Sequence, residues 1–212
     1  METLGVGVEA ARGRIKGVLF REFADWYAKE AGQPAMAEAV ARMADADQAL
    51  LDAQRPGLGI VVSDWYPAAL GHRLIDATLV GHSDAEKDAM AWRSGLSVVE
   101  ASMRGLQKLA FELLMTPARY RTYIQRIWNL NFDSGRCSVE DTGQYEQLGT
   151  IRQWRGHHPF ICKMIVAGKP KIYQAMGCRS VEVRVVSCVS NGSDACRSQT
   201  RWNRSSITPR PQ

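Results

Sequence analysis

The chain contains 212 residues, of which 45% are hydrophobic and 23% are charged, and its formal net charge is +5. This length and composition suit one soluble domain that buries its core without disulfide bonds, and the apolar runs are too short and too interrupted to span a membrane. The basic surplus is not accompanied by a helix-turn-helix pattern, a zinc-finger spacing or a basic strand interleaved with aromatic residues, so nucleic acid is not an expected partner. The N-terminus lacks an apolar signal core, which makes a cytoplasmic location the expectation.

Residues 1–13 are expected to form a flexible lead-in, and residues 14–203 a single ligand-binding domain whose helical part covers 14–130. Apolar residues at helical spacing, together with capping signals such as Ser83 and Glu86, predict the helices. They cover residues 15–31, 34–44, 70–79, 83–115 with a break near Gly95 or Gly105, and 117–128. Between the second and third of these helices, residues 59–63 are predicted to form a short strand or an extended segment, and residues 64–67 a corner.

The sheet-rich part covers residues 131–203, and residues 204–212 are expected to be a disordered tail. Alternating apolar residues and turn signals predict four strands, at 136–140, 148–154, 181–186 and 196–202. One long helix is predicted between the second and third strands, over residues 159–176, with an adjustment near Gly168-Lys169-Pro170. The fold class is therefore α+β, with an N-terminal helical layer packed on a C-terminal antiparallel sheet that has one long helix laid against it.

Three of the five cysteines are spaced as a candidate metal site. Cys162 lies in the long helix, whereas Cys188 and Cys196 lie at the two ends of the turn between the last strands. A hairpin brings its two cysteines together, and three thiolates suit a zinc ion, which takes soft ligands and a fourth donor. His158 precedes Cys162 by four residues and is the expected fourth donor, with His157 the weaker choice. The alternative is that these cysteines are ordinary small buried residues.

The same segment carries a family resemblance. Cys162, a glycine, a strand, Cys188, a glycine-centred turn and Cys196 follow one another in the order found in the 4-vinyl reductase domain. That small-molecule-binding fold is shared with TRAPP vesicle-transport subunits and is similar to the sensors of phenol- and toluene-responsive activators. In those sensors the matching cysteines hold structural zinc together with a glutamate, where this sequence has Val185. The wider layout also resembles a myxobacterial paralogous family of unestablished function.

The resemblance implies a small apolar or aromatic ligand between the helical layer and the sheet. The predicted ligand-binding residues are aromatic side chains of the helical part, because pockets are mostly apolar with a few polar anchors. They are Trp65, Tyr66, Tyr120, Tyr123 and Trp128. The competing interpretation is that aromatic residues at helical spacing form an ordinary core.

The leading functional hypothesis is a sensory or regulatory small-molecule-binding protein with structural zinc, a homodimer that signals through an unidentified protein partner. No catalytic residue is predicted. One alternative is a zinc-dependent enzyme, in which Val185 leaves a metal position open for an activated water. A second is a haem-based gas sensor, against which the absence of a haem-sensor motif argues. A third is a scaffold of the vesicle-tether type, expected if the helical layer encloses no cavity.

Overall fold

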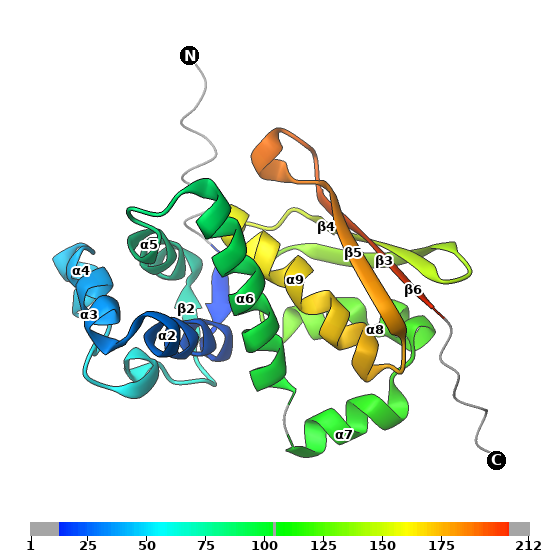
Figure 1. The fold of residues 1–212 in the computed structure, drawn as a ribbon, viewed down its shortest axis with the longest axis horizontal. Coiled ribbons are helices and arrows are strands. Elements are labelled where there is room, and N and C mark those ends of the chain that lie inside the picture. The colour runs from blue at the N-terminus through cyan, green and yellow to red at the C-terminus, as the bar shows by residue number, and fades with distance from the viewer. Residues whose placement is uncertain (1–12, 104, 204–212) are drawn as a thin grey trace.

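The computed structural model describes residues 13–103 and 105–203, except for the side chains of residues 105–108 and 110. The predicted disordered tail, and all but the last residue of the predicted lead-in, lie outside the described residues. Helices occupy the first part of the chain and an antiparallel sheet the second (Figure 1). The predicted α+β fold class is therefore confirmed.

The helical part begins with a small two-stranded sheet, in which β1 (Arg14–Lys16) pairs antiparallel with β2 (Trp65–Pro67). Its helices are α2 (Gly17–Ala31), α3 (Gln33–Ala41), α4 (Asp45–Gln48), α5 (Ala68–Thr78), α6 (Asp84–Ser102), α7 (Gly105–Leu114) and α8 (Pro117–Asn129). The predicted capping box starts α6, because Ser83 accepts a hydrogen bond from the Glu86 backbone and Glu86 accepts one from the Ser83 backbone.

The strand predicted at residues 59–63 is wrong. The 3₁₀ helix η1 (Pro56–Gly59) precedes this segment, and the chain there is left-handed, with φ values of 60° at Gly57, 57° at Leu58 and 72° at Gly59. Left-handed backbone cannot continue as a strand. Extended pairing is delayed until β2, within the segment predicted to be a corner.

The sheet has the strand order β3-β4-β6-β5, and every neighbouring pair is antiparallel. Its strands are β3 (Arg136–Gly143), β4 (Glu146–Arg152), β5 (Arg179–Ser187) and β6 (Cys196–Asn203). The two edge strands are irregular, because the pairing register shifts between Asp141 and Gly143 in β3, and twice along β5. A second 3₁₀ helix, η2 (Val189–Asn191), forms part of the turn from β5 to β6.

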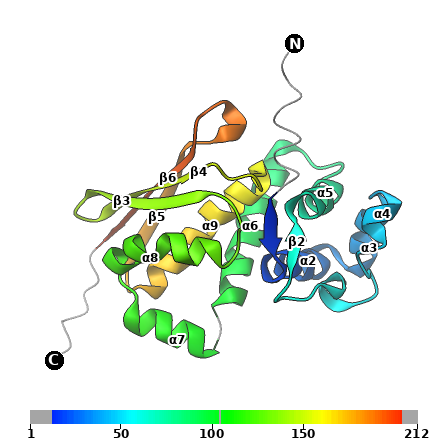
Figure 2. The same cartoon turned by 180° about the vertical axis from the view of Figure 1, so that it is seen from behind.

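The long helix α9 (Pro159–Ala175) occupies the centre of the molecule and continues through Pro170. It contacts β5 on one side and α6 on the other, and α8 contacts β3. Figures 1 and 2 show α6 between α9 and the helices α2 to α5, while α8 and α9 lie beside the sheet. The helical layer therefore meets the sheet around α9.

Helices α6 and α9 approach each other through glycines. A Cβ atom built on Gly95 of α6 would lie 2.3 Å from the Met164 carbonyl oxygen of α9, and one built on Gly168 of α9 would lie 2.4 Å from a Val99 methyl carbon. Neither distance is possible for real atoms, so each helix needs a residue without a side chain at these points. Of the two positions predicted for a helix break, Gly95 and Gly105, the second is correct, because α6 continues through Gly95 to Ser102 and α7 begins at Gly105.

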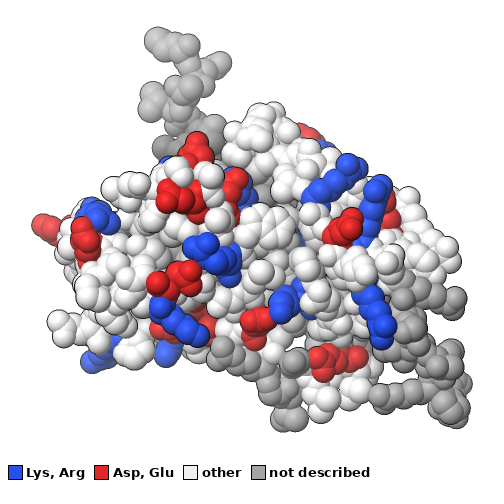
Figure 3. Space-filling model, viewed as in Figure 1, with Lys and Arg blue, Asp and Glu red and all other residues white. Residues whose placement is uncertain are grey.

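Among the described residues, no helix is long and apolar enough to cross a membrane. On the face drawn in Figure 3, basic and acidic side chains are interspersed. Several charged side chains of the described residues are paired, as in the contacts of Arg93 with Glu30 and of Lys163 with Asp88. This face carries no extended basic patch of the kind that tracks a nucleic-acid backbone.

Candidate functional site

An apolar pocket of about 190 Å³ lies between the helices and the inner face of the sheet. Residues from α2, α5, α6, α8 and α9 form one side of its wall, and residues from all four strands of the main sheet form the other. The volume is below the roughly 300–1,000 Å³ of pockets for drug-sized ligands and somewhat above the roughly 150 Å³ of an engineered cavity that binds benzene. In this form the pocket suits a small apolar molecule.

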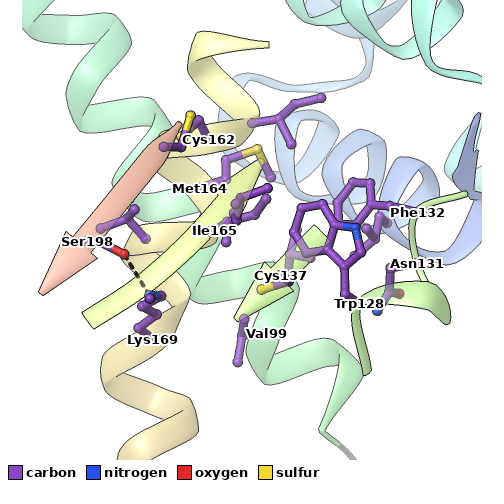
Figure 4. Close-up of a pocket in the computed structure, with 18 of the residues that line it drawn as sticks. Val99, Trp128, Asn131, Phe132, Cys137, Cys162, Met164, Ile165, Lys169 and Ser198 are labelled. Carbon is purple, nitrogen blue, oxygen red and sulfur yellow. Dashed lines mark hydrogen bonds between the residues drawn. The ribbon is translucent and has the colours of Figure 1, made fainter. Parts of the chain in front are cut away.

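Two of the five predicted ligand-binding aromatic residues line this pocket, namely Tyr120 and Trp128 of α8. Both are buried, and Trp128 stacks on Phe132 with ring centroids 4.2 Å apart. Figure 4 shows this stacked pair at one end of the pocket. Burial raises the pKa of Tyr120 well above its ordinary value, so its hydroxyl stays protonated and can donate a hydrogen bond.

The structure places the other three predicted residues outside the pocket wall. Trp65 lies under Lys16, whose Nζ is 4.7 Å from the ring centroid, and the hydroxyl of Tyr66 accepts a hydrogen bond from the Val61 backbone at 2.9 Å. Tyr123 is 41% exposed on the outer face of α8. Trp65 and Tyr66 belong to the small β1–β2 sheet, and Tyr123 lies at the protein surface.

The pocket contains one lysine in an otherwise mostly apolar wall. Lys169 of α9 is buried, and its Nζ donates a hydrogen bond of 2.6 Å to the hydroxyl of Ser198 on β6, as Figure 4 shows. Burial lowers the pKa of Lys169, because an ammonium group loses its hydration there. The sequence signal for this residue is weak, because the same helix contains two further lysines, Lys163 and Lys171.

A second cluster lies where the start of α9 meets the last hairpin. The donor atoms of His157, Cys162, Cys188 and Cys196 all lie within 4.8 Å of one another. The Cys188 sulfur is 3.4 Å from the Cys196 sulfur and 3.8 Å from the Cys162 sulfur. The structure therefore brings together the three cysteines that the spacing selected, and the three sulfurs are buried among core residues.

The histidine in this cluster is His157 rather than the predicted His158. The Nε2 atom of His157 is 3.4 Å from the Cys188 sulfur. His158 is instead the N-cap of α9, where its Nδ1 accepts a hydrogen bond from the Phe160 backbone, and its Nε2 lies 3.2 Å from Asp76. Because Pro159 begins the helix, His158 does not share a helical face with Cys162, and its ring points away from the thiols.

The pKa values of two thiols in the cluster shift in opposite directions. Cys162 donates a hydrogen bond to Cys196, and together with His157 this contact lowers the pKa of Cys196. The same hydrogen bond, together with burial, raises the pKa of Cys162. One sulfur is thus held as a thiolate, the form that ligates metals. The cluster offers four protein donors, the number of a closed tetrahedral site, whereas the enzyme alternative requires an open position at Val185.

No family profile matches the chain, and no curated protein matches it. Solved structures do match along nearly their whole length. An H-NOX variant from K. algicida has a TM-score of 0.62 at 13% identity, over 89% of this chain and 97% of that chain. The S. oneidensis H-NOX protein in its Fe(II)NO state has a TM-score of 0.62 at 11% identity, over 89% and 99%. A structure from work on haem distortion in the H-NOX family reaches 0.65 at 7% identity, over 93% and 100%.

At these identities the likeness establishes the fold: the chain has the H-NOX fold. The predicted membership of the 4-vinyl reductase superfamily, and the likeness to the myxobacterial family, are therefore wrong. The cofactor prediction, which favours zinc and argues against haem, is also wrong, because these neighbours point to haem. Of the functions predicted from the sequence, the haem-based gas sensor agrees better with the neighbours than the zinc-containing sensor does.

Proposed function

We propose that the protein is a small-molecule sensor that uses the H-NOX fold and receives its ligand in the apolar pocket. The observation that carries this proposal is a pocket enclosed between α8, α9 and the sheet, with an apolar wall and very few polar groups. Such a site favours apolar ligands and fixes their orientation through the few polar groups present. The predicted homodimer and the protein partner that would receive the signal remain proposals as well.

The structural neighbours support haem as the molecule bound in the pocket. Haem iron in proteins is held by histidine, cysteine, methionine or tyrosine. None of the four histidines lies in the pocket wall, whereas Cys137, Met164 and Tyr120 do. We propose Cys137 of β3 as the iron ligand, because a thiolate ligates haem and this residue has no part in the cysteine cluster. Bound haem would supply an iron that binds diatomic gases.

Burial raises the pKa of Cys137 to about 11, so this thiol must lose a proton when it ligates a metal. Cys137 lies close to Trp128 in Figure 4 and packs against the surrounding core. Because the pocket is small, haem also requires wall side chains to move apart. Both requirements lower the affinity for haem, and the loss of the thiol proton makes that affinity increase as the pH rises toward the pKa of Cys137.

Titration of the purified chain with haemin tests this function. The expected result is one equivalent bound with a sharp Soret band, and a Soret shift when nitric oxide is added to the ferrous form. Cys137→Ala is expected to displace the Soret maximum and to weaken binding by about tenfold or more. Cys178→Ala is the matched control, because Cys178 is another free cysteine of the sheet-rich part but does not line the pocket. A wild-type protein that gives only the spectrum of free haemin contradicts haem as the ligand.

We propose separately that His157, Cys162, Cys188 and Cys196 hold a metal ion that prefers thiolate ligands. The supporting observation is four donors of suitable type at mutual distances under 4.8 Å, one of them stabilised as a thiolate. Metal held there would join the start of α9 to the β5–β6 hairpin and stabilise both.

Cobalt(II) is a suitable probe of this cluster, since thiolate coordination gives intense charge-transfer absorption. One equivalent is expected to bind, and His157→Ala is expected to weaken binding by about tenfold or more. His158→Ala is the matched control, because the neighbouring ring is engaged with Asp76 and should leave cobalt binding unchanged. Equal losses in the two variants, or no thiolate absorption in the wild type, would refute the site.

A further inference from the structure

The buried end of Lys169 reaches the sheet at one pair of residues on neighbouring strands. Gly149 of β4 and Ser198 of β6 are partners in the antiparallel register. The Lys169 ammonium donates to the Ser198 hydroxyl, and a Cβ atom added to Gly149 would lie 2.5 Å from Nζ. Gly149 therefore leaves the space that the ammonium occupies, and the lysine is built into the pocket rather than folded over its rim.

This ammonium has more hydrogen-bond donors than partners. A protonated lysine offers three N–H groups and no acceptor, and the Ser198 hydroxyl takes one of them. Within residues 13–103 and 105–203, no carboxylate is found within ion-pair distance of Lys169, and only 9% of the residue is exposed to water. Burial of a charge without a partner is strongly unfavourable, so an anion bound beside Lys169 would offset that cost.

Two other lysines of the same helix show the contrast. Lys163 pairs with Asp88 of α6, and Lys171 pairs with Glu100 of α6. Both lie on the outer side of α9, where water also screens their charge. Lys169 projects from the opposite side of the helix into the pocket and meets neutral groups instead.

We infer that the pocket binds an apolar molecule that carries a carboxylate. Lys169 and Ser198 hold the carboxylate, and the apolar wall contacts the apolar part of the molecule. This inference rests on the proposed ligand-binding function of the pocket and names the class of its ligand. Charge-assisted hydrogen bonds between an ammonium and a carboxylate are among the strongest available to a buried site. The carboxylate has two possible sources, a simple apolar acid or a propionate of haem.

Calorimetric titration with octanoate and with 1-octanol separates the charge from the apolar chain. Wild-type protein is expected to bind octanoate at least about tenfold more tightly than the uncharged 1-octanol. Lys169→Met removes the charge and keeps a side chain of similar length, so it should abolish this preference and leave the binding of 1-octanol intact. Lys163→Met is the control on the same helix and should keep the preference for octanoate.

Competition identifies the source of the carboxylate. Displacement of octanoate by haemin, with weaker haemin binding in Lys169→Met, assigns the anchor to a propionate. Octanoate binding that depends on Lys169 in a protein without a Soret response assigns it to a simple acid, and then only the haem proposal fails. Equal affinity of the wild type for octanoate and 1-octanol, no binding of either probe, or an octanoate preference that survives in Lys169→Met overturns the inference.

Discussion

Replacement of Gly95 by valine is expected to destabilise the fold by about 2–3 kcal/mol, the range of overpacked cores. The Cβ atom would meet the Met164 carbonyl at 2.3 Å, and this carbonyl belongs to the backbone of α9 and cannot rotate away. Valine is a slightly better helix former than glycine, but that gain is only a few tenths of a kcal/mol. The steric cost therefore decides the outcome, because α6 and α9 must separate.

Urea unfolding followed by circular dichroism measures this change. Ala89→Val is the matched control, since Ala89 lies on the exposed side of α6. This substitution introduces the same β-branched side chain away from the contact with α9. The control should lose less than about 1 kcal/mol through helix propensity alone. If both variants unfold at the same urea concentration, the close approach of α6 and α9 does not contribute to stability.

Acidification from pH 7 to pH 4 is expected to cost about 2–3 kcal/mol of stability through His72. Burial, and to a lesser extent the neighbouring His158 ring at a centroid distance of 4.9 Å, lowers the pKa of His72 to about 4. The unfolded chain has the ordinary histidine pKa of about 6.5. Between these two values the unfolded state binds a proton that the folded state refuses, so stability is complete above about pH 6.5 and falls as the pH decreases toward 4.

His72→Gln is the test variant, because an amide can still donate to the Gly156 carbonyl that His72 contacts at 3.1 Å. The measurement is the free energy of unfolding in urea at several pH values between 7.5 and 4.5. The difference in the free energy of unfolding between wild type and His72→Gln should narrow or reverse toward low pH. The free energy of unfolding of His82→Gln should change with pH in the same way as that of the wild type. A constant difference across this range would show that His72 is not a neutral buried histidine.

Local patterns in the sequence predicted much of the fold. The capping box at Ser83 and the proline that begins α8 mark helix starts through contacts within one turn, and the structure contains both. The strand predicted at residues 59–63 failed because Gly59 still belongs to a left-handed 3₁₀ turn and Val62 and Ser63 form a further turn, which their apolar neighbours do not indicate. The H-NOX fold itself required comparison in three dimensions, since the sequence identities to these structures are only 7–16%.

The candidate sites also contain features that follow from the local sequence and features that depend on the folded structure. Hairpin geometry is local, so the spacing of Cys188 and Cys196 sufficed to bring their sulfurs together. The choice between His157 and His158 depends on which residue caps α9, and a shift of one position turns the ring away from the thiols. The role of Lys169 was harder to predict from the sequence, because it depends on Gly149 and Ser198, which lie beside this lysine only in the folded protein.

The register shifts in both outer strands have a consequence for association. An unbroken strand at the margin of a sheet offers a regular row of amide and carbonyl groups to another polypeptide, which is the usual start of fibrillar stacking. Here β3 and β5 are each interrupted, so a neighbouring molecule cannot align with either over its full length. Concentrated solutions of this protein should therefore resist growth into continuous β-structure, and any pairing of two copies should use the helical surface instead.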